Sequence, residues 1–260
     1  MARKDDYYNR AKQQGYRARS AYKLKQLDET ANLLSEGDTV VDLGAAPGSW
    51  MQVATELVGP QGTVVGVDRQ RIDDIEAEAT VEYVRGDITD ERTHEEIVDV
   101  LGAEDERPAD VVVSDMAPNM SGEYDLDHAR SVHLARQALD VALTLLDSGG
   151  DFVVKVFDGR DLEDLISDIE PDFEYVRQVR PDASRDASSE LYLVAKNRLT
   201  APVRAGDELE VEITDEGAEG DGIARVEGFT VFVPDAEVGE HVRIRIDDVK
   251  PRFGFAERIE

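Results

Sequence analysis

The chain has 260 residues, which suits one large domain or a medium domain followed by a small one, and its lack of cysteine excludes disulfide scaffolds, thiolate zinc sites and cysteine nucleophiles. Its 58 acidic and 29 basic residues give a net charge of −29, typical of a soluble protein in a high-salt cell or, alternatively, of an acidic protein that avoids nucleic acid. With no membrane-length apolar run and no apolar secretory core near residue 1, we expect a cytoplasmic protein.

The first 25 residues are basic, in contrast to the rest of the chain. They hold eight Lys or Arg residues and two Asp, a net charge of +6, whereas the remaining residues carry −35. Basic side chains interleaved with tyrosines suit RNA, so residues 1–25 are predicted to form an RNA-binding arm. A solvated helix face is the alternative. The basic residues predicted to contact phosphates are Arg3, Lys4, Arg10, Lys12, Arg17 and Arg19.

Short valine-rich segments alternate with helical segments as far as residue 195. The apolar segments lack polar alternation, which is typical of strands buried on both faces of a parallel sheet. The clearest helix covers 127–146 and is predicted to end at Ser148-Gly149-Gly150. The pattern predicts a doubly wound, Rossmann-like α/β domain. The predicted strands are 39–43, 63–67, 81–84, 110–115, 151–157 and 190–195.

The pattern changes near residue 197. Residues 197–204 are predicted to form a linker, and the strands after it alternate apolar and polar residues between glycine-containing turns. Such short alternating strands predict a small antiparallel β-barrel over residues 201–259. Its predicted strands are 206–214, 222–234, 240–250 and 253–259.

The segment VVDLGAAPGSW, residues 40–50, follows the first strand and opens a helix. Gly44 and Gly48 bracket a tight turn, where a ligand can approach the backbone and the free amides of a helix start. A dinucleotide loop would need glycine where this chain has Ala46 and Ser49, and Pro47 also fits that loop poorly. The turn therefore predicts a nucleotide-like cofactor, with only a weak match to NAD or flavin enzymes.

Aspartates follow the next three strands. Asp68 lies about 20 residues beyond the glycines, where a carboxylate can accept hydrogen bonds from ribose hydroxyls. Asp87 follows the third strand and Asp115 the fourth. Each alone could be a helix cap or a loop residue. Together they lie at the strand ends where open α/β sheets bind ligands, so they predict a binding site.

These motifs resemble the FtsJ family of S-adenosylmethionine-dependent RNA 2′-O-methyltransferases. The resemblance covers residues 1 to about 196, and it implies S-adenosylmethionine as cofactor and a ribose 2′-hydroxyl as methyl acceptor. Bacterial-type members act on a uridine in the A-loop of 23S rRNA, so large-subunit rRNA or the large ribosomal subunit is the expected partner. The matching motifs are RSAYKL with Lys23, DLGAAPGSW, Asp68, Asp87, DMAPN with Asp115, the strand of Lys155 and SSELYLV with Glu190.

The C-terminal part, residues 201–259, resembles a TRAM domain, a small β-barrel attached to RNA-modifying enzymes. The segments GFTVFVP at 228–234 and GE at 239–240 carry this resemblance. Bacterial rRNA members usually lack the extension, so it points to an archaeal member, in agreement with the acidic composition.

The resemblance places the family's catalytic tetrad on Lys23, Asp115, Lys155 and Glu190. Lys155 interrupts an otherwise apolar strand, DFVVKVF, and burial disfavours the charged form of a lysine. We therefore expect Lys155 to accept the proton of the ribose hydroxyl, the alternative being a lysine that extends from the strand end to solvent. The resemblance implies that Asp115 orients this amine, Lys23 stabilises charge on the ribose oxygen, and Glu190 positions Lys23 or the ribose.

The resemblance implies cofactor contacts from Gly48, Trp50, Asp68, Asp87 and Asp115. A lone tryptophan is more often a core residue, but the position of Trp50 directly after the glycine turn favours a ligand contact. The four histidines are scattered along the chain, and methyl transfer needs no metal, so we expect no metal site.

The charge of the barrel disfavours RNA binding unless its basic residues gather on one face. Residues 201–260 hold 16 acidic and seven basic residues, a net charge of −9, so binding would require its basic residues to share one face. Phe253 and Phe255 lie near them in the sequence. The basic residues considered are Arg243, Arg245, Lys250, Arg252 and Arg258.

Three other functions compete with rRNA methylation. A tRNA 2′-O-methyltransferase of the same family would differ only in its substrate surface. A non-catalytic RNA-binding or ribosome-assembly factor is disfavoured by the complete tetrad. A nicotinamide-dependent oxidoreductase is disfavoured by Ala46 and Pro47 in the glycine turn.

Overall fold

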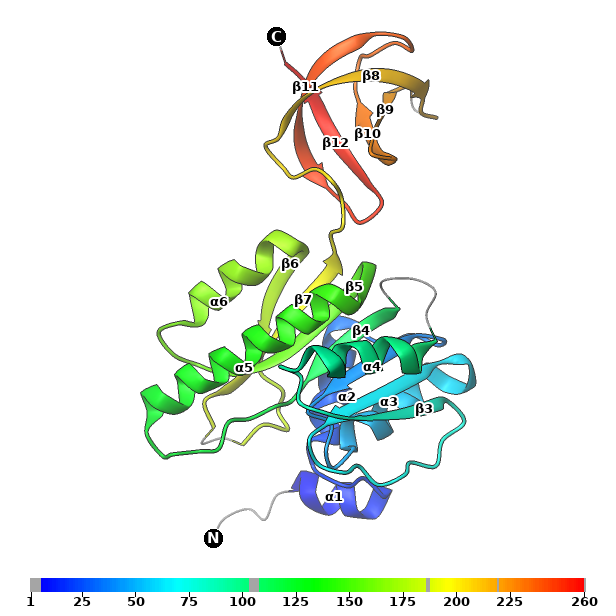
Figure 1. Ribbon diagram of the computed structural model, residues 1–260. Coiled ribbons are helices and arrows are strands. Elements are labelled where there is room, and N and C mark those ends of the chain that lie inside the picture. The colour runs from blue at the N-terminus through cyan, green and yellow to red at the C-terminus, as the bar shows by residue number, and fades with distance from the viewer. Residues whose placement is uncertain (1–5, 103–107, 186–187, 219, 260) are drawn as a thin grey trace.

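The structure, a computed structural model, describes residues 6–102, 108–185, 188–218 and 220–259. Arg3 and Lys4 of the predicted arm lie outside these residues. The chain forms a seven-stranded sheet covered by helices, followed by a five-stranded closed barrel (Figure 1). The predicted fold class, an α/β domain with a small β-barrel, is confirmed. In the part of the chain described, no helix is long and apolar enough to cross a membrane.

The central sheet has the strand order β3-β2-β1-β4-β5-β7-β6. Its first five strands along the chain run parallel, and β7 runs antiparallel to both of its neighbours. The order therefore differs from that of the dinucleotide-binding fold by the antiparallel strand inserted next to β5. The strands are β1 (Thr39–Leu43), β2 (Thr63–Asp68), β3 (Thr80–Arg85), β4 (Ala109–Ser114), β5 (Leu146–Phe157), β6 (Phe173–Val179) and β7 (Glu190–Arg198).

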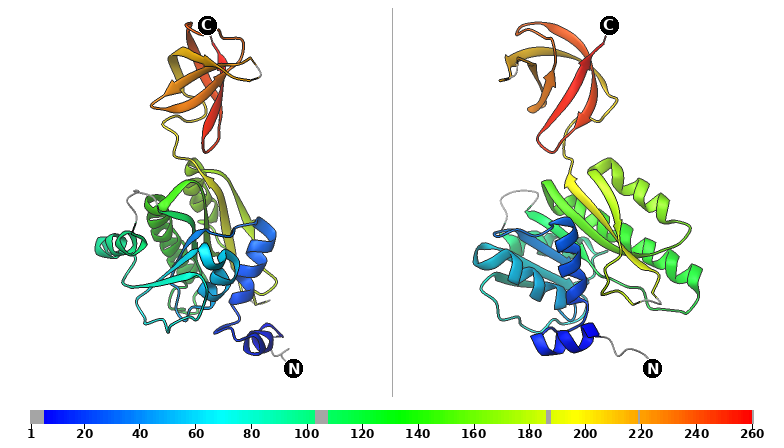
Figure 2. Two further views of the ribbon diagram at one scale, coloured as in Figure 1. Left: turned by 90° about the vertical axis from the view of Figure 1, so that its right-hand side faces the viewer. Right: turned by 180° about the vertical axis from the view of Figure 1, so that it is seen from behind.

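Helices cover both faces of this sheet, which explains why its central strands are apolar on both sides (Figure 2). Leu24 of α2 and Met51 of α3 pack on one face, whereas Ile97 of α4, Leu145 of α5 and Leu165 of α6 pack on the other. The helices are α1 (Asp6–Gln14), α2 (Ala21–Ala31), α3 (Ser49–Val58), α4 (Glu91–Leu101), α5 (Tyr124–Leu145) and α6 (Leu162–Ile169), with two 3-10 turns, η1 (Gly59–Gln61) and η2 (Glu170–Asp172).

The sequence pattern misses one strand and misplaces one helix end. β6 is not predicted because it lies at the sheet edge, where only Phe173 of its residues is buried and no apolar run results. The predicted helix 127–146 ends one residue early, at Leu145, and Ser148-Gly149-Gly150 do not cap it. These three residues belong to an irregular stretch at the start of β5, because Leu146 pairs with Ala109 and regular pairing with β4 resumes only at Asp151.

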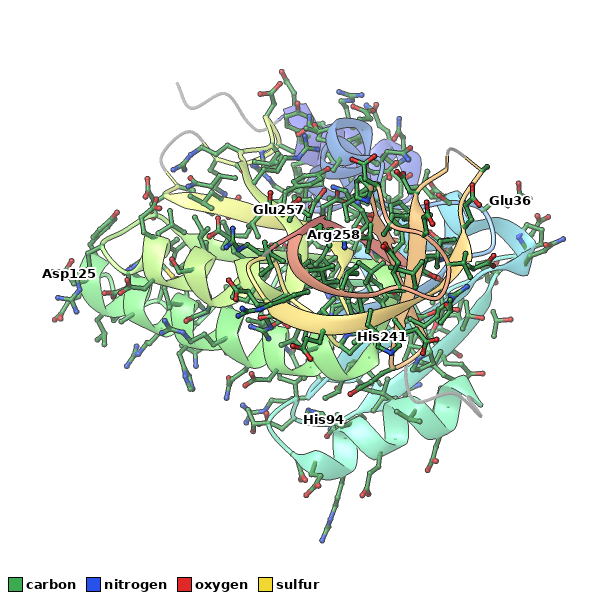
Figure 3. All side chains as sticks on the ribbon, turned by 90° about the horizontal axis from the view of Figure 1, so that it is seen from above. Glu36, His94, Asp125, His241, Glu257 and Arg258 are labelled. Carbon is green, nitrogen blue, oxygen red and sulfur yellow. The ribbon has the colours of Figure 1, made fainter. Side chains whose placement is uncertain are left out.

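The barrel closes in the strand order β10-β12-β11-β8-β9 around a small apolar core that includes Ile213, Val231 and Ile244. Its pairings are antiparallel as predicted, except that β10 runs parallel to β12. Figure 3 looks onto the barrel from above, with Glu257 and Arg258 of β12 labelled. The strands are β8 (Glu208–Glu216), β9 (Gly222–Val226), β10 (Phe229–Val233), β11 (His241–Val249) and β12 (Phe253–Arg258).

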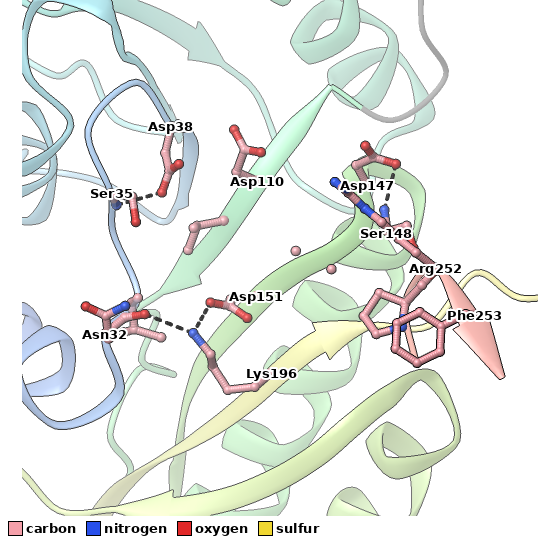
Figure 4. Close-up of a pocket in the computed structure, with 15 residues that line it drawn as sticks. Asn32, Ser35, Asp38, Asp110, Asp147, Ser148, Asp151, Lys196, Arg252 and Phe253 are labelled. Carbon is pink, nitrogen blue, oxygen red and sulfur yellow. Dashed lines mark hydrogen bonds and ion pairs between the residues drawn. The ribbon is translucent and has the colours of Figure 1, made fainter. Parts of the chain in front are cut away.

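The barrel contacts the sheet near the start of β5. Ser148 Oγ donates a hydrogen bond to the carbonyl oxygen of Pro251 over 2.6 Å. A cleft of about 530 Å³ lies at this junction, with Phe253 on its barrel side and Asp151 on its sheet side (Figure 4). From Asp151, where regular pairing with β4 resumes, to Lys155, β5 extends about 13 Å at about 3.3 Å per residue. The barrel therefore lies at the opposite end of the strand from Lys155.

Candidate active site

A cavity of about 400 Å³ lies at the carboxyl ends of four neighbouring strands. Gly44 follows β1, Asp68 ends β2, Asp87 follows β3 and Asp115 follows β4, and all four line the cavity. The structure thus brings together the three predicted strand-end aspartates. The volume is that of a typical small-molecule site. The other lining residues are Ala46, Val67, Arg69, Gln70, Gly86, Ile88, Met116, Ala117, Leu134 and Gln137.

The turn after β1 requires glycine at position 44. Gly44 has a φ of +78°, in the left-handed region, and a Cβ atom there would lie 2.2 Å from Cγ of Met116. The amide of Gly44 donates to the carbonyl oxygen of Val67 over 2.8 Å, and the amide of Ala46 donates to Asp68 Oδ2 over 2.9 Å. These bonds fix the turn against the end of β2.

The carboxylates of Asp68 and Asp87 are held by backbone amides. Asp68 Oδ1 accepts a hydrogen bond from the amide of Gln70 over 2.7 Å. Asp87 Oδ1 accepts from the amide and the hydroxyl of Thr89, and these bonds lower the pKa of Asp87. Because a carboxylate offers about four acceptor positions, both residues retain sites for the hydroxyl groups of a ligand.

Asp42 of β1 is a buried carboxyl group that the sequence does not single out. It is 1% exposed, and its Oδ2 atom has no hydrogen-bond partner. Burial, followed by the nearby charges of Asp115 and Asp68, raises the pKa of Asp42 well above its ordinary value. Asp42 does not line the cavity, whose charged lining residues are Asp68, Asp87, Asp115 and Arg69. This excess of carboxylates in the lining favours a ligand that carries positive charge.

The four residues of the predicted tetrad form one cluster beside the cavity. Lys155 Nζ donates to Asp115 Oδ1 over 2.8 Å and also to the backbone carbonyl oxygen of Asp115. Lys23 Nζ lies 2.7 Å from Glu190 Oε1 and 3.8 Å from Asp115 Oδ1. The side chains of Lys23 and Lys155 are 10% and 7% exposed, so both lysines are largely removed from water.

Tyr192 is a member of this cluster that the sequence analysis misses. Its hydroxyl donates to Asp115 Oδ1 over 2.6 Å, and its ring lies 5.7 Å from Lys23 Nζ. Burial and the charge of Asp115 raise the pKa of Tyr192 well above its usual value, so the hydroxyl remains a donor. Glu190 and Tyr192 are two residues apart on one strand face, a signal that could have identified it.

Gly48 and Trp50 are not among the residues that line the cavity. Gly48 precedes α3 with a φ of +98°, and a Cβ atom there would lie 2.7 Å from Arg17 Nη1. Trp50 is 2% exposed, donates from Nε1 to the carbonyl oxygen of Ser20 over 2.8 Å, and packs against Tyr192. Trp50 therefore supports the cluster from the core. A cofactor contact by either residue stays a prediction.

The basic arm is attached to the domain by some of its own arginines. Arg17 donates to the carbonyl oxygens of Pro47 and Asp74 over 2.8 and 2.7 Å, and Arg19 donates to a carbonyl oxygen as well. Lys12 is exposed on α1. Arg17 therefore holds the arm next to the glycine turn, and Arg19 bonds to Ala183, between β6 and β7. Phosphate contacts from the arm stay a prediction.

The arrangement can support proton transfer next to a bound cofactor. Asp115 lines the cavity and also holds the amine of Lys155, so a ligand in the cavity lies next to the lysines. Among the described residues, no group of three or more His, Asp or Glu side chains is placed to hold a metal ion. Fold and candidate site together define a Rossmann-like α/β protein with a ligand-sized cavity beside a buried lysine–carboxylate cluster.

Comparison with known proteins narrows this class. The chain belongs to the FtsJ-like methyltransferase family, which matches residues 16–198, and a TRAM domain matches residues 202–259. It is 71% identical, over the full length of both chains, to "Ribosomal RNA large subunit methyltransferase E" of Haloarcula marismortui. It is 66% identical, again over both full lengths, to the protein of the same name from Natronomonas pharaonis.

A more distant relative of the same name, from Methanosarcina mazei, is 50% identical over 99% of this chain and 94% of its own length. Among solved structures, a protein assigned as a ribosomal RNA methyltransferase from Plasmodium falciparum is similar, with a TM-score of 0.62 and 27% sequence identity. The similarity covers 70% of this chain and 98% of that one. These matches confirm the predicted family.

Proposed function

We propose that this protein methylates a ribose 2′-hydroxyl of large-subunit rRNA, with S-adenosylmethionine as donor and a uridine of the A-loop as target. The observation that carries the proposal is the double role of Asp115, which lines the cavity and holds Lys155. Family membership and the names of the full-length relatives support the reaction and the substrate class. Ribosomal subunits are the expected partner, and the cytoplasm is the expected location.

The cavity fits S-adenosylmethionine in size and in charge. Its volume of about 400 Å³ suits a nucleoside-sized ligand, and its carboxyl groups suit a cationic one. Asp68 would accept hydrogen bonds from the ribose hydroxyls of the cofactor, Asp87 would lie near its adenine, and Asp115 would lie toward its methionine part. Gly48 would contribute through the turn after β1, and Trp50 through the start of α3 that follows this turn. When bound, the cofactor supplies a methyl group on a sulfonium, which is a good leaving group.

Lys155 would accept the proton of the ribose hydroxyl as the oxygen–carbon bond forms and the carbon–sulfur bond breaks. In the neutral amine, two N–H groups can donate to the Oδ1 and carbonyl oxygens of Asp115. The lone pair of Nζ is then left for the incoming proton. Asp115 thereby fixes the direction of the amine, and a positioned general base of this kind contributes about 10²–10⁴ in rate.

The other residues of the cluster would stabilise the acceptor oxygen. Lys23 lies within 3.8 Å of Asp115 Oδ1 and would favour negative charge on the ribose oxygen. Glu190 holds Lys23 over 2.7 Å, and Tyr192 occupies a further position on Asp115. All residues of the cluster come from the α/β domain. We therefore propose that residues 1–196 carry the chemistry and that residues 201–259 serve substrate recognition.

Methyl transfer from labelled S-adenosylmethionine tests this function. Large ribosomal subunits lacking the modification, free large-subunit rRNA and bulk tRNA are offered separately in molar potassium chloride, and the labelled nucleotide is mapped. We expect label on the A-loop uridine of subunit or free rRNA. Label on tRNA alone would contradict the substrate, and absence of label with intact cofactor binding would support the assembly-factor alternative.

Cofactor choice is tested independently of the RNA. S-adenosylmethionine is expected to raise the melting temperature of the protein by mass action, whereas NAD is not. A stabilisation by NAD alone would contradict the methyltransferase assignment of the cavity.

A further inference from the structure

Most basic residues of the barrel are already neutralised by carboxylates. Arg243 and Arg245 both pair with Glu208, at 2.8 and 3.2 Å, and Arg258 pairs with Glu240 at 3.3 Å. Lys250 likewise pairs with residues of the barrel and of the sheet. Of the five basic residues considered for an RNA face, all but Arg252 are therefore paired with carboxylates, which weakens their attraction for phosphates and favours an RNA contact by another chemistry.

Three phenylalanines occupy the outer face of the barrel where β10 and β12 run side by side. Phe232 is the register partner of Phe255, and Phe253 lies two residues before Phe255 on the same strand face. The residues between them, Val231 and Gly254, are buried on the inner side. Because these strands alternate, the phenylalanines point away from the barrel core, where a soluble barrel ordinarily has polar residues.

The three rings form a compact cluster that we call the phenylalanine platform, consisting of Phe232, Phe253 and Phe255. Their centroids lie 5.4–5.8 Å apart, with two edge-to-face pairs and one tilted pair. Phe253 is 36% exposed and Phe255 43% exposed, so part of each ring is accessible to solvent. Exposed apolar groups gathered in this way mark an interaction surface.

Two arginines flank this platform without a carboxylate partner among the described residues. Thr230 of β10 lies between its two register partners, Arg225 of β9 and Phe253 of β12. The guanidinium of Arg225 donates hydrogen bonds to the Thr230 hydroxyl and to the carbonyl oxygen of Gly228. Arg252 precedes Phe253 and is exposed (Figure 4). The cations that remain available on these strands are thus next to the exposed rings.

We propose that the phenylalanine platform, flanked by Arg225 and Arg252, stacks on unpaired bases of the rRNA substrate. This inference rests on the proposed function and assigns the RNA-contacting surface of the barrel. Aromatic rings and arginines side by side are the chemistry that binds single-stranded RNA. Base stacking does not release counterions, so it persists in a high-salt cell where phosphate contacts weaken steeply.

The platform contacts RNA far from the reacting ribose. Phe253 lines the junction cleft together with Asp151, and about 13 Å of β5 separate Asp151 from Lys155. An RNA that contacts the platform and Lys155 at the same time must therefore extend along the domain from one end of β5 to the other. The barrel therefore adds affinity for a large substrate and leaves the chemical step unchanged.

A triple variant, Phe232→Leu, Phe253→Leu and Phe255→Leu, tests the platform because it keeps apolar groups and removes the rings. Tyr175→Leu, an exposed aromatic residue on β6, is the matched control. We expect the triple variant to raise KM for free rRNA about tenfold or more. The kcat of the triple variant should equal that of the wild type. Its KM should also equal the wild-type value for a minimal RNA hairpin that reaches Lys155 but is too short to reach the platform. The control should equal the wild type throughout.

Repeating the titration over a range of potassium chloride separates stacking from charge. The ratio of KM between triple variant and wild type is expected to stay constant with salt, whereas the effect of Lys12→Ala in the arm should diminish as salt rises. An unchanged KM for rRNA, or an equal rise on the hairpin, would overturn the proposal. So would loss of a dimer in sedimentation with an unchanged KM, because the platform would then join two copies of this chain.

Binding of labelled oligouridine in the absence of cofactor keeps this test independent of catalysis. If the wild type fails to methylate any rRNA, the proposed function fails, yet weaker oligouridine binding by the triple variant would still support the platform. Equal binding by variant and wild type would overturn it.

Discussion

Two buried lysine–carboxylate pairs lie four residues apart on β5, at Asp151 and Lys155, and their surroundings differ. At the carboxyl end, Lys155 pairs with Asp115 beside the 400 Å³ cavity. Toward the amino end, Asp151 of β5 pairs with Lys196 of β7. Asp151 also accepts from the amide of Asn197 over 3.0 Å, and Lys196 donates to the carbonyl oxygen of Asn32 over 3.0 Å. The second pair joins β5, β7 and the end of α2.

The difference teaches that a buried lysine is not by itself a catalytic signal. Both pairs are largely removed from water, and burial raises the pKa of Asp151 even with Lys196 beside it. Both pairs border a cavity, because Asp151 and Lys196 line the 530 Å³ cleft. The Lys155 pair, however, has a second lysine, Lys23, beside it, whereas the other partners of the Lys196 pair are backbone groups. We therefore propose catalysis for the first pair and cohesion of the sheet for the second.

The largest stability effect is expected for Lys196→Ala, because it leaves the carboxylate of Asp151 buried without its cation. Breaking such a pair typically lowers the free energy of unfolding by about 3–5 kcal/mol. The kcat of the folded fraction should be unchanged. Thermal unfolding in molar potassium chloride measures this, with Lys25→Ala in the exposed Lys25–Glu56 pair as the control, where about 1 kcal/mol or less is expected. An equal loss of unfolding free energy in both variants would contradict the structural role of the Lys196–Asp151 pair.

Asp68→Asn tests whether the cavity binds S-adenosylmethionine. It removes the charge from an acceptor of the Ala46 amide and of the proposed cofactor hydroxyls. Hydrogen bonds to charged groups contribute about 1.5–3 kcal/mol, so the Kd for S-adenosylmethionine should rise about 10- to 100-fold. Calorimetric titration checks this, and Asp73→Asn, an exposed residue nearby, should bind normally. An unchanged Kd for Asp68→Asn would remove Asp68 from the cofactor site.

Asp42→Asn tests a third buried carboxyl group, one without a lysine. Because its pKa is raised in the folded state, that state binds a proton more tightly than the unfolded chain. The stability from Asp42 is present below its unfolded pKa and is lost as pH rises through the higher folded pKa, by at most about 1.4 kcal/mol per pH unit. The free energy of unfolding should therefore fall less steeply with rising pH in the variant. Parallel curves for variant and wild type would show that Asp42 does not titrate as inferred.

Tyr192→Phe should have the smallest effect. It removes one neutral donor from Asp115 Oδ1 and keeps the bond from Lys155. A loss of about 0.5–1.5 kcal/mol corresponds to a roughly two- to tenfold lower kcat at saturating substrates, with little change in KM. Tyr175→Phe on the exposed face of β6 is the control. A loss comparable to that of a tetrad residue would mean that the phenol has a direct catalytic role.

Much of the fold could be predicted because buried parallel strands leave an apolar signature. Lys155 stands out in the sequence since it interrupts such a strand, and the three aspartates stand out since they follow strand ends. Tyr192 does not stand out, because a tyrosine among apolar residues looks like a core residue until its hydroxyl is seen on Asp115. β6 is hidden by its half-exposed position at the sheet edge.

Other features depend on contacts across the chain that no local pattern contains. The position of Trp50 after the glycine turn favours a ligand contact, yet Tyr192 and Ser20 surround it in the core. The basic residues of the barrel suggest an RNA face, yet carboxylates on neighbouring strands neutralise Arg243 and Arg245. Only the register of β10 and β12 shows that three phenylalanines share one outer surface.

The most direct test of the central claim is methyl transfer by Lys155→Ala beside donor binding by the same protein. If Lys155 accepts the ribose proton, single-turnover transfer to large-subunit rRNA by the folded protein should fall by about 10²–10⁴, while the Kd for S-adenosylmethionine remains close to that of the wild type. The loss of stability should be smaller than for Lys196→Ala, because Asp115 keeps the hydrogen bond from Tyr192 and the nearby charge of Lys23. Near-normal transfer by this variant would contradict the assignment and show that the lysine of β5 is structural, like Lys196.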